Sequence, residues 1–197
     1  MNRKSVLETV YSLANDAIII FSTGYVSREA FTIEDRDSNF YMLGSMGLAA
    51  SIGIGMAINM IKKPIIVIEG DGSFLMNPSN IFLAKNLHLN NFLHIILDNN
   101  SYESTGGQKT CSNILDFATI ASASGYTSVR IENLCDLEEN LNNFLKFRNG
   151  PIFYDIKIEL SKEKIAPRVN IPLVQLNNRL SKYCSNSRGI VNIFSHI

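Results

Sequence analysis

The stretch IIVIEGDGSFLMNPSN, residues 65–80, joins an apolar run to Gly70-Asp71-Gly72 and then to a polar break before a predicted helix. The apolar run is rich in β-branched residues and has no polar face, which is typical of a strand in a parallel sheet covered by helices. Asp-Gly is also ordinary turn chemistry, so these residues alone leave a plain turn open. The rest of the chain has to decide between a turn and a ligand site.

Short apolar runs alternate with helical patterns along the chain. The expected strands are 17–21, 40–43, 64–70, 92–97 and 152–158. The expected helices are 3–14, 48–61, 77–89, 113–124 and 136–147, with Asn77 as N-cap and Pro78 in the first turn of the third. This alternation predicts an α/β fold, a three-layer sandwich around a central, mostly parallel sheet.

The pattern weakens toward the end of the chain. We expect one domain over residues 1–180 and a C-terminal tail over 181–197. The whole segment 159–197 is weakly patterned, and its last dozen residues are expected to be disordered or to wrap around a partner.

Composition excludes several classes of function. The 197 residues are 46% hydrophobic and 18% charged, as in a globular protein, and Lys+Arg and Asp+Glu both number 18. A net charge of zero gives no electrostatic case for binding nucleic acid or an anionic membrane. Three cysteines without metal-type spacing suit a reducing compartment. Without a signal-peptide pattern or a membrane-length apolar run, the sequence predicts a cytoplasmic protein.

Polar loops follow the predicted strands at 22–28, 70–74 and 98–108, and a fourth lies at 44–47. Ligands bind at the carboxyl ends of strands in open α/β sheets, so these loops are expected to converge. Asp71, Asn99 and the Ser101 carbonyl offer the hard oxygen ligands that magnesium prefers. Gly72 and Ser73 offer backbone N–H groups and a hydroxyl to a phosphate. A plain turn is the alternative reading of Asn99-Asn100.

Gly70-Asp71-Gly72, followed after 26 residues by Asn99-Asn100, resembles the cofactor-binding motif of thiamin-diphosphate enzymes. FYMLGSMGLAASIGIGMA at 40–57 and LDNNSYESTGGQKT at 97–110 are similar to phosphonopyruvate and sulfopyruvate decarboxylases. Gly24 and Ser27-Arg28-Glu29 fit the same family. The resemblance covers residues 3–180 and implies the thiamin-diphosphate-binding fold, with thiamin diphosphate and Mg²⁺ as cofactors.

The resemblance also implies roles for single residues. Asp71, Asn99 and the Ser101 carbonyl match the magnesium ligands. The Gly44 carbonyl matches the acceptor for the cofactor's aminopyrimidine, and Met46 matches the apolar residue that holds the cofactor bent, although core packing would also explain a methionine there. The remaining matched cofactor contacts are Ser27, Ser45, Gly70, Gly72 and Ser73. Two residues depart from the commonest pattern: Asp98 replaces an Asn, and Asn100 replaces a Gly at a position that needs a positive φ.

The family's activating glutamate lies on a separate pyrimidine-binding domain. Glu69, at a strand end, and Glu29 and Glu103, in predicted loops, do not replace it. The resemblance therefore implies that this chain is the diphosphate-binding subunit of a hetero-oligomer, with no catalytic residue assigned on this chain. The expected partner is a pyrimidine-binding, alpha-type subunit.

The implied reaction is decarboxylation of a small anionic 2-oxo acid. Thr105-Gly106-Gly107-Gln108 favours 3-phosphonopyruvate, converted to phosphonoacetaldehyde, whereas a split chain favours sulfopyruvate, converted to sulfoacetaldehyde. The candidate groups for the anionic head are Arg28, Ser104, Thr105, Gln108 and Lys109, although Arg28 and Lys109 could equally be solvated surface charges.

Three other functions remain open at this stage. The chain could serve a different thiamin enzyme, could be a non-catalytic binding module, or could bind a dinucleotide. The last lacks a Gly-x-Gly-x-x-Gly turn after a first strand, because Gly53 and Gly55 lie inside a predicted helix, where they indicate close packing. His94, in a buried strand, is expected to be a core residue.

Overall fold

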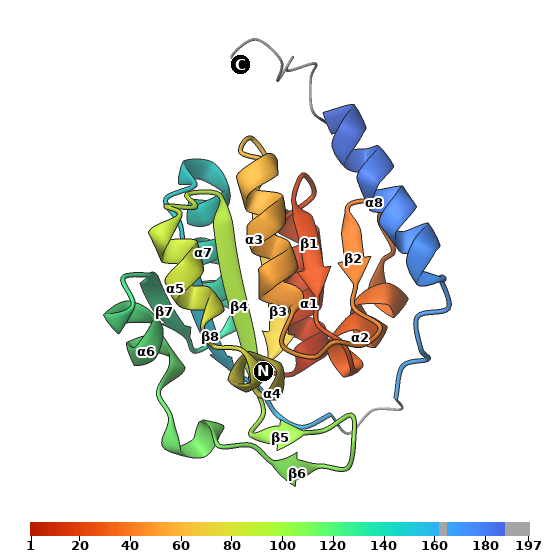
Figure 1. Cartoon of the computed structure of the whole chain (residues 1–197). Helices are drawn as coiled ribbons and strands as arrows, with labels where there is room; N and C mark the ends of the chain where they lie inside the picture. The colour runs from red at the N-terminus through yellow and green to blue at the C-terminus, as the bar shows by residue number, and fades with distance from the viewer. Residues whose placement is uncertain (162–164, 188–197) are drawn as a thin grey trace.

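Helices and strands alternate along the computed structural model, which describes residues 1–161 and 165–187 (Figure 1). The strands are β1 (Ile18–Phe21), β2 (Asn39–Tyr41), β3 (Ile65–Gly70), β4 (Phe92–Asp98), β5 (Ser101–Tyr102), β6 (Gln108–Lys109), β7 (Thr127–Ile131) and β8 (Ile152–Lys157). The helices are α1 (Arg3–Leu13), α2 (Tyr25–Ile33), α3 (Ala49–Asn59), α4 (Asp71–Met76), α5 (Asn80–Asn86), α6 (Phe117–Ala123), α7 (Leu134–Phe147) and α8 (Leu173–Ser187), with a 3₁₀ turn η1 (Ser112–Ile114).

The central sheet has the order β2-β1-β3-β4-β8-β7, and every pairing in it is parallel. The side chains of β4 are buried along its whole length, as are those of β3 up to Gly70, because helices cover both faces. Figure 1 shows α3 and α5 in front of the sheet and α1 and α7 behind it. The α/β prediction with a central, mostly parallel sheet is confirmed.

The order of the strands creates a crevice at one edge of the sheet. From β1 the chain moves outward to β2, and from β3 it moves the opposite way to β4. Such a reversal leaves space at the carboxyl ends of the two middle strands, where ligands bind in folds of this class. The segments that follow β1, β3 and β4 therefore begin side by side.

Some predicted boundaries are wrong around the opening stretch. Residues 70–74 are not a loop, because α4 begins at Asp71, directly after β3. Asn77 does not cap the next helix: it ends α4, and its backbone N–H donates to the Phe74 carbonyl. Pro78 consequently lies in the turn before α5, whose N-cap is Ser79. Glu29 also lies in a helix, α2, rather than in a loop.

Several elements were not predicted, among them β7 and α8. β7 is an edge strand whose side chains are mostly half-buried or exposed, so it lacks the apolar run of the other strands. α8 crosses the expected boundary at 180 and buries Leu176, Leu180 and Cys184, spaced by four, against the sheet edge at β2. The division into domain and tail stays a prediction, and residues 188–197, on which the expectation for the last dozen mainly falls, lie outside the described residues.

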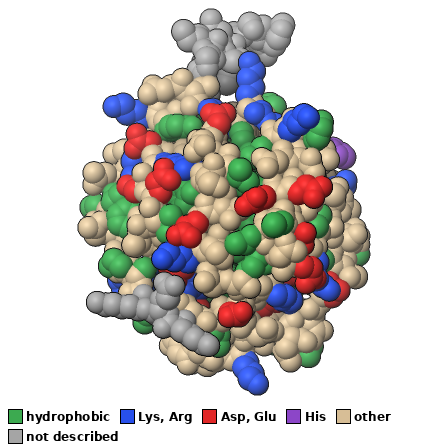
Figure 2. All heavy atoms as spheres, turned by 180° about the vertical axis from the view of Figure 1, so that it is seen from behind, with side chains coloured by type: hydrophobic (Ala, Val, Ile, Leu, Met, Phe, Trp, Pro, Cys, Tyr) green, Lys and Arg blue, Asp and Glu red, His purple; other side chains and the backbone are tan. Residues whose placement is uncertain are grey.

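The back of the molecule carries acidic and basic side chains mixed with apolar ones (Figure 2). That mixture agrees with the net charge of zero. Among the described residues, no helix has the length and apolar character needed to cross a membrane.

Helix α3 owes its position to Gly53. A methyl group at Gly53 would overlap the Val67 side chain of β3 and come within 3.0 Å of the Phe92 ring of β4. Gly55 lies in the same helix, and a methyl group there would meet nothing within 4 Å. The two glycines therefore have different reasons to be present.

We expect opposite effects from the same substitution at these two glycines. Gly53→Ala should lower the free energy of unfolding by about 1–3 kcal/mol, because the core has no room for the methyl group. Gly55→Ala should raise it by about 0.5–1 kcal/mol, because alanine loses less backbone entropy in a helix. Urea denaturation of both variants measures the difference, and equal effects would contradict the close approach at Gly53.

Candidate functional site

A cleft lies at the carboxyl ends of β1, β3 and β4, lined by the segments that follow these strands and by Arg3 from α1. The predicted site residues that line it are Met46, Gly70, Asp71, Gly72, Ser73, Asn99, Ser101 and Ser104. The cleft contains about 50 Å³ of free space, whereas small-molecule sites usually offer about 300–1,000 Å³. In this chain alone, the cleft is thus too small to enclose a whole cofactor.

Asp71 is the buried carboxylate of this cleft, with 2% of its surface exposed. Its Oδ2 accepts a hydrogen bond from the Thr110 hydroxyl at 2.5 Å, and the Ser112 hydroxyl lies 3.2 Å away. Burial raises the pKa of Asp71 and the nearby charge of Asp98 raises it further, while the hydrogen bonds from Thr110, Ser112 and the Gly72 backbone lower it. A buried negative charge of this kind is well placed to bind a cation.

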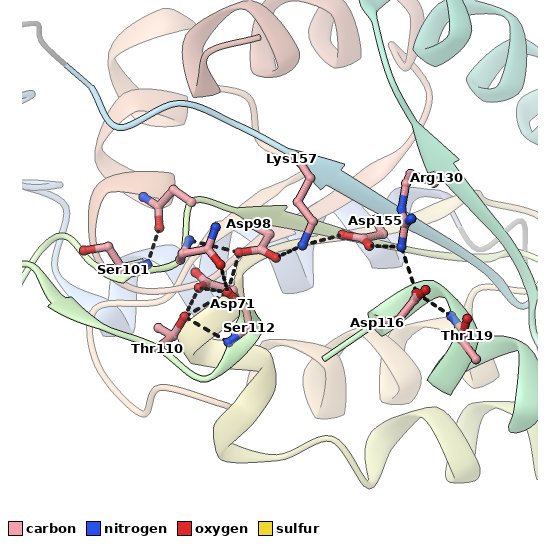
Figure 3. A network of polar contacts seen from close by, with 12 residues as sticks. Asp71, Asp98, Ser101, Thr110, Ser112, Asp116, Thr119, Arg130, Asp155 and Lys157 are labelled. Carbon is pink, nitrogen blue, oxygen red and sulfur yellow. Dashed lines mark hydrogen bonds and ion pairs between the residues drawn. The ribbon is translucent and has the colours of Figure 1, made fainter. Parts of the chain in front are cut away.

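Asp98, the departure from the family pattern, has its own partners. It is fully buried, its Oδ1 accepts from the Asn100 backbone N–H at 3.0 Å, and its other oxygen pairs with Lys157 of β8. Asn100 adopts a φ of 57°, as expected for a residue that replaces glycine. The lysine compensates the charge that an asparagine would not carry. Figure 3 shows the chain of contacts from Asp71 through the Ser112 hydroxyl to Asp98, and from there through Lys157 to Asp155.

Asn99 and Ser101 present oxygen atoms beside Asp71. The Asn99 Oδ1 accepts from the Ser101 backbone N–H at 3.0 Å, and its Nδ2 donates to Glu103 Oε2 at 2.9 Å. Among the described residues, no group of three His, Cys, Asp or Glu side chains could hold a metal ion. The donor set here fits magnesium instead, since that ion takes one or two carboxylates and completes its shell with other oxygens, phosphates included.

Ser73 links the cleft to the segment 44–47. Its hydroxyl donates to Glu69 Oε2 at 2.6 Å and accepts from the Gly47 backbone N–H at 3.1 Å. Glu69 also contacts His94 at 2.6 Å, so the histidine is a paired core residue, as predicted. These contacts fix segment 44–47 relative to the start of α4.

Gly72 lies beneath two side chains that close the cleft. A methyl group there would overlap the Tyr102 ring and come within 3.2 Å of the Met46 methyl. Glycine is therefore required at this point by a close approach. Met46 is half-buried and faces the cleft rather than the core cluster.

Other predicted residues lie outside this cleft. Gly44 and Ser45 line an adjacent apolar pocket together with Leu43 and Leu48. The Ser27 hydroxyl is buried and faces the Gly24 and Met42 carbonyls at 3.3 and 3.4 Å. The remaining substrate candidates do not line the cleft: Arg28, whose guanidinium lies over the Tyr25 ring, and the exposed Thr105, Gln108 and Lys109 around β6.

Sequence reasoning missed several residues of the site. Thr110 and Ser112 follow the polar loop, and their hydroxyls could have been suggested by that position. Tyr102 and Glu103 lie inside the loop without a chemical signature of their own. Arg3 stands about a hundred residues away in the sequence, and no local pattern could have joined it to the site.

The row of carboxylates continues to Asp155, which is fully buried and has no hydrogen-bond partner on either carboxylate oxygen among the described residues. Its nearest cations are Arg130, at 3.6 Å, and Lys157, at 4.0 Å. Burial raises the pKa of Asp155; the Lys157 and Arg130 charges lower it, and those of Asp98 and Asp116 raise it. The native state thus holds this proton more tightly than the unfolded chain does.

Stability should therefore respond to pH through Asp155. A raised native pKa means that wild type loses stability as the pH rises above the unfolded value of about 3.9. Asp155→Asn removes this loss, so the free energy of unfolding of the variant should rise relative to that of wild type as the pH increases above about 4, measured by urea titrations at a series of pH values.

Asp116→Asn is the matched control, because Asp116 pairs with the same Arg130 at 2.9 Å and is exposed. The Thr119 backbone N–H holds the pKa of Asp116 below its usual range. The free energy of unfolding of Asp116→Asn should therefore fall relative to that of wild type as the pH rises. The same pH trend in both variants would refute the assignment to Asp155.

Comparison with known proteins identifies the class to which this site belongs. Residues 25–156 match the family described as "Thiamine pyrophosphate enzyme, C-terminal TPP binding domain", thiamine pyrophosphate being thiamin diphosphate. A phosphonopyruvate decarboxylase of Streptomyces viridochromogenes is 37% identical over 162 residues, which are 79% of this chain but 40% of that protein. A sulfopyruvate decarboxylase subunit beta of Methanococcus maripaludis is 34% identical over 182 residues, 91% of this chain and 95% of that one.

The fold has relatives among solved structures as well. A thiamine diphosphate-dependent 4-hydroxybenzoylformate decarboxylase of Rhodococcus jostii superposes with a TM-score of 0.71 at 16% identity, over 83% of this chain and 33% of that one. Its likeness concerns the fold alone. Together with the family match and the two relatives of higher identity, it leads to one conclusion: the chain belongs to the thiamine pyrophosphate enzymes, as a C-terminal-type thiamine-pyrophosphate-binding domain related to decarboxylases.

Proposed function

We propose that this chain is the diphosphate-binding subunit of a two-chain thiamin-diphosphate- and Mg²⁺-dependent decarboxylase. The observation that carries the proposal is the convergence of Asp71, Asn99 and Ser101 with Gly72 and Ser73 in one cleft at the strand ends.

In this proposal the chain binds the charged end of the cofactor. Asp71, the Asn99 amide oxygen and the Ser101 carbonyl hold Mg²⁺, and Gly72 and Ser73 bind the diphosphate. Bound thiamin diphosphate supplies the electron sink for the loss of carbon dioxide. Further contacts, from the Gly44 carbonyl and from Met46, lie at the segment that the Gly47–Ser73 hydrogen bond holds in place.

The activating carboxylate comes from a partner subunit. Glu69 is buried between Ser73 and His94, and Glu29 and Glu103 are both paired with Arg3. None of these glutamates is free to act on the cofactor. A relative that this chain covers to 95% of its length is named a subunit beta. The phosphonopyruvate relative, by contrast, is covered to only 40% of its length. Both facts support a pyrimidine-binding, alpha-type partner.

We infer that the substrate is 3-phosphonopyruvate, decarboxylated to phosphonoacetaldehyde. The loop Thr105-Gly106-Gly107-Gln108 supports this choice. Identity does not separate the two candidates, because a sulfopyruvate decarboxylase of Methanosarcina acetivorans is 37% identical to this chain, as the phosphonopyruvate relative is. Sulfopyruvate is the second candidate, because the sulfopyruvate relative is a chain of matching length. Both substrates carry an anionic head, for which Ser104 at the cleft and Arg28, Thr105, Gln108 and Lys109 nearby in the sequence are the proposed contacts. The cytoplasmic location stays a prediction.

Removal of the proposed metal ligand tests the cofactor site. Asp71→Ala should abolish Mg²⁺-dependent binding of thiamin diphosphate in the complex with the partner, because the only carboxylate of the proposed donor set is lost. Equilibrium dialysis with labelled cofactor measures it. Asp37→Ala, which removes an exposed carboxylate outside the cleft, should bind as wild type does. Tight cofactor binding by the Asp71 variant would refute the metal assignment.

Substrate choice has a direct measurement. We expect carbon dioxide release from phosphonopyruvate when the chain is co-expressed with its partner and supplied with thiamin diphosphate and Mg²⁺. Carbon dioxide release from sulfopyruvate alone would make sulfopyruvate, rather than phosphonopyruvate, the substrate. Cofactor binding without turnover of either would point to another thiamin enzyme, and loss of both binding and turnover would favour a non-catalytic module.

A further inference from the structure

Arg3 is a buried arginine that joins three separate segments of the chain. Only 5% of its surface is exposed. Its Nε and Nη2 donate to the two carboxylate oxygens of Glu29 in α2, at 2.9 and 2.8 Å, and its Nη1 donates to Glu103 Oε2 at 2.7 Å. Two charge-assisted bonds to one carboxylate and a third to another hold both glutamates firmly.

This arginine is not itself placed to bind an anion. Although Arg3 lines the cleft, two carboxylates face its single positive charge, so the group of three carries a net negative charge. A phosphate or phosphonate would have to displace one of these glutamates. The geometry therefore points to a role through Glu103 rather than through direct contact with a ligand.

Glu103 and the Ser101 backbone N–H together determine which way the Asn99 amide faces. Its Oε2 accepts from both Arg3 and the Asn99 Nδ2, and its Oε1 accepts from the Ser161 backbone N–H at 3.0 Å. Because the Glu103 carboxylate accepts from the Arg3 guanidinium and from the Asn99 amide on the same oxygen, the NH₂ end of the amide faces it. The oxygen of Asn99 then faces the Ser101 backbone N–H and the cleft.

We propose that Arg3 and Glu103 are positioning residues, which fix the Asn99 amide with its oxygen toward the metal. The inference rests on the metal site of the proposed function. It adds the two residues that turn the oxygen of the Asn99 amide, rather than its NH₂ group, toward the ion. An amide turned over would present N–H groups to a cation. Partners of this kind, behind a metal ligand, commonly change metal affinity by about 10–100-fold when they are removed.

The test uses Mn²⁺ in place of Mg²⁺, with the full chain in complex with its partner and with thiamin diphosphate present. Electron paramagnetic resonance of free Mn²⁺ gives the concentration at half-saturation without any measurement of activity. Glu103→Gln should raise this concentration by about 10-fold or more, because a glutamine side chain offers both a donor and an acceptor and the Asn99 amide can turn over.

A second substitution separates orientation from structural damage. Asn99→Asp places an oxygen on both ends of the side chain, so orientation no longer matters. In the Glu103→Gln background it should restore Mn²⁺ affinity to near the wild-type value, because the introduced amide can donate to the introduced carboxylate. In the wild-type background Asn99→Asp should give no gain, because two carboxylates would then meet at a contact that is now 2.9 Å.

Arginine variants supply the matched control. Arg3→Lys loses the guanidinium hydrogen bonds to both glutamates and should weaken Mn²⁺ binding. Asn99→Asp should not restore binding in this background, because Glu103 is still a carboxylate facing residue 99. Arg179→Lys breaks a comparable pair with Asp35, at 2.7 and 2.9 Å, outside the cleft, and should leave the half-saturation concentration unchanged.

The outcomes separate this inference from the proposed function. Unchanged Mn²⁺ binding in Glu103→Gln, or a loss in that variant that Asn99→Asp does not repair, overturns the positioning role. If Asp71→Ala still abolishes binding in that case, the metal site itself stands. Absence of Mn²⁺ binding in the wild-type complex overturns both.

Discussion

The burial of one carboxylate, Asp71, is the constraint on which the rest of this structure depends. The chain gives it hydrogen bonds from Thr110 and the backbone of Gly72, but it also places the negative charge of Asp98 nearby. An uncompensated buried charge costs several kcal/mol. The fold carries that cost at the edge of its sheet, where the site gains attraction for a cation that a better satisfied carboxylate would lack.

The sequence predicts those parts of the fold and site that depend on local pattern. The apolar runs of β3 and β4 indicate a parallel sheet that helices cover on both faces. The glycines around Asp71, with Asn99 downstream, indicate the class of cofactor. β7 was not predicted because an edge strand needs no apolar run. α4 was not predicted because six residues after a strand are too few to show a helical period. α8 was missed because its buried stripe consists of only Leu176, Leu180 and Cys184 within a largely polar segment.

The least predictable part of the site is the set of contacts between distant segments. Arg3, Glu29 and Glu103 are ordinary charged residues in the sequence, and only the folded chain brings them together. Their pairing also limits what the chain can do alone, since it engages two of the glutamates nearest the cleft. The division of labour between two subunits, as proposed, is consistent with a chain that uses its carboxylates for structure and metal binding.

The close approach at Gly53 has a consequence for the breadth of the site. Segment 44–47 leads directly into α3, and its other anchor is the Gly47–Ser73 hydrogen bond. Because the backbone at Gly53 already lies close to Val67 and Phe92, the helix has no room to move nearer to the sheet. If the cofactor ring rests on this segment, as in the proposed function, a bulkier ring cannot be accommodated by moving α3 toward the sheet. The absence of a side chain at Gly53, a residue that touches no ligand, can therefore limit the size of the ring that the site accepts.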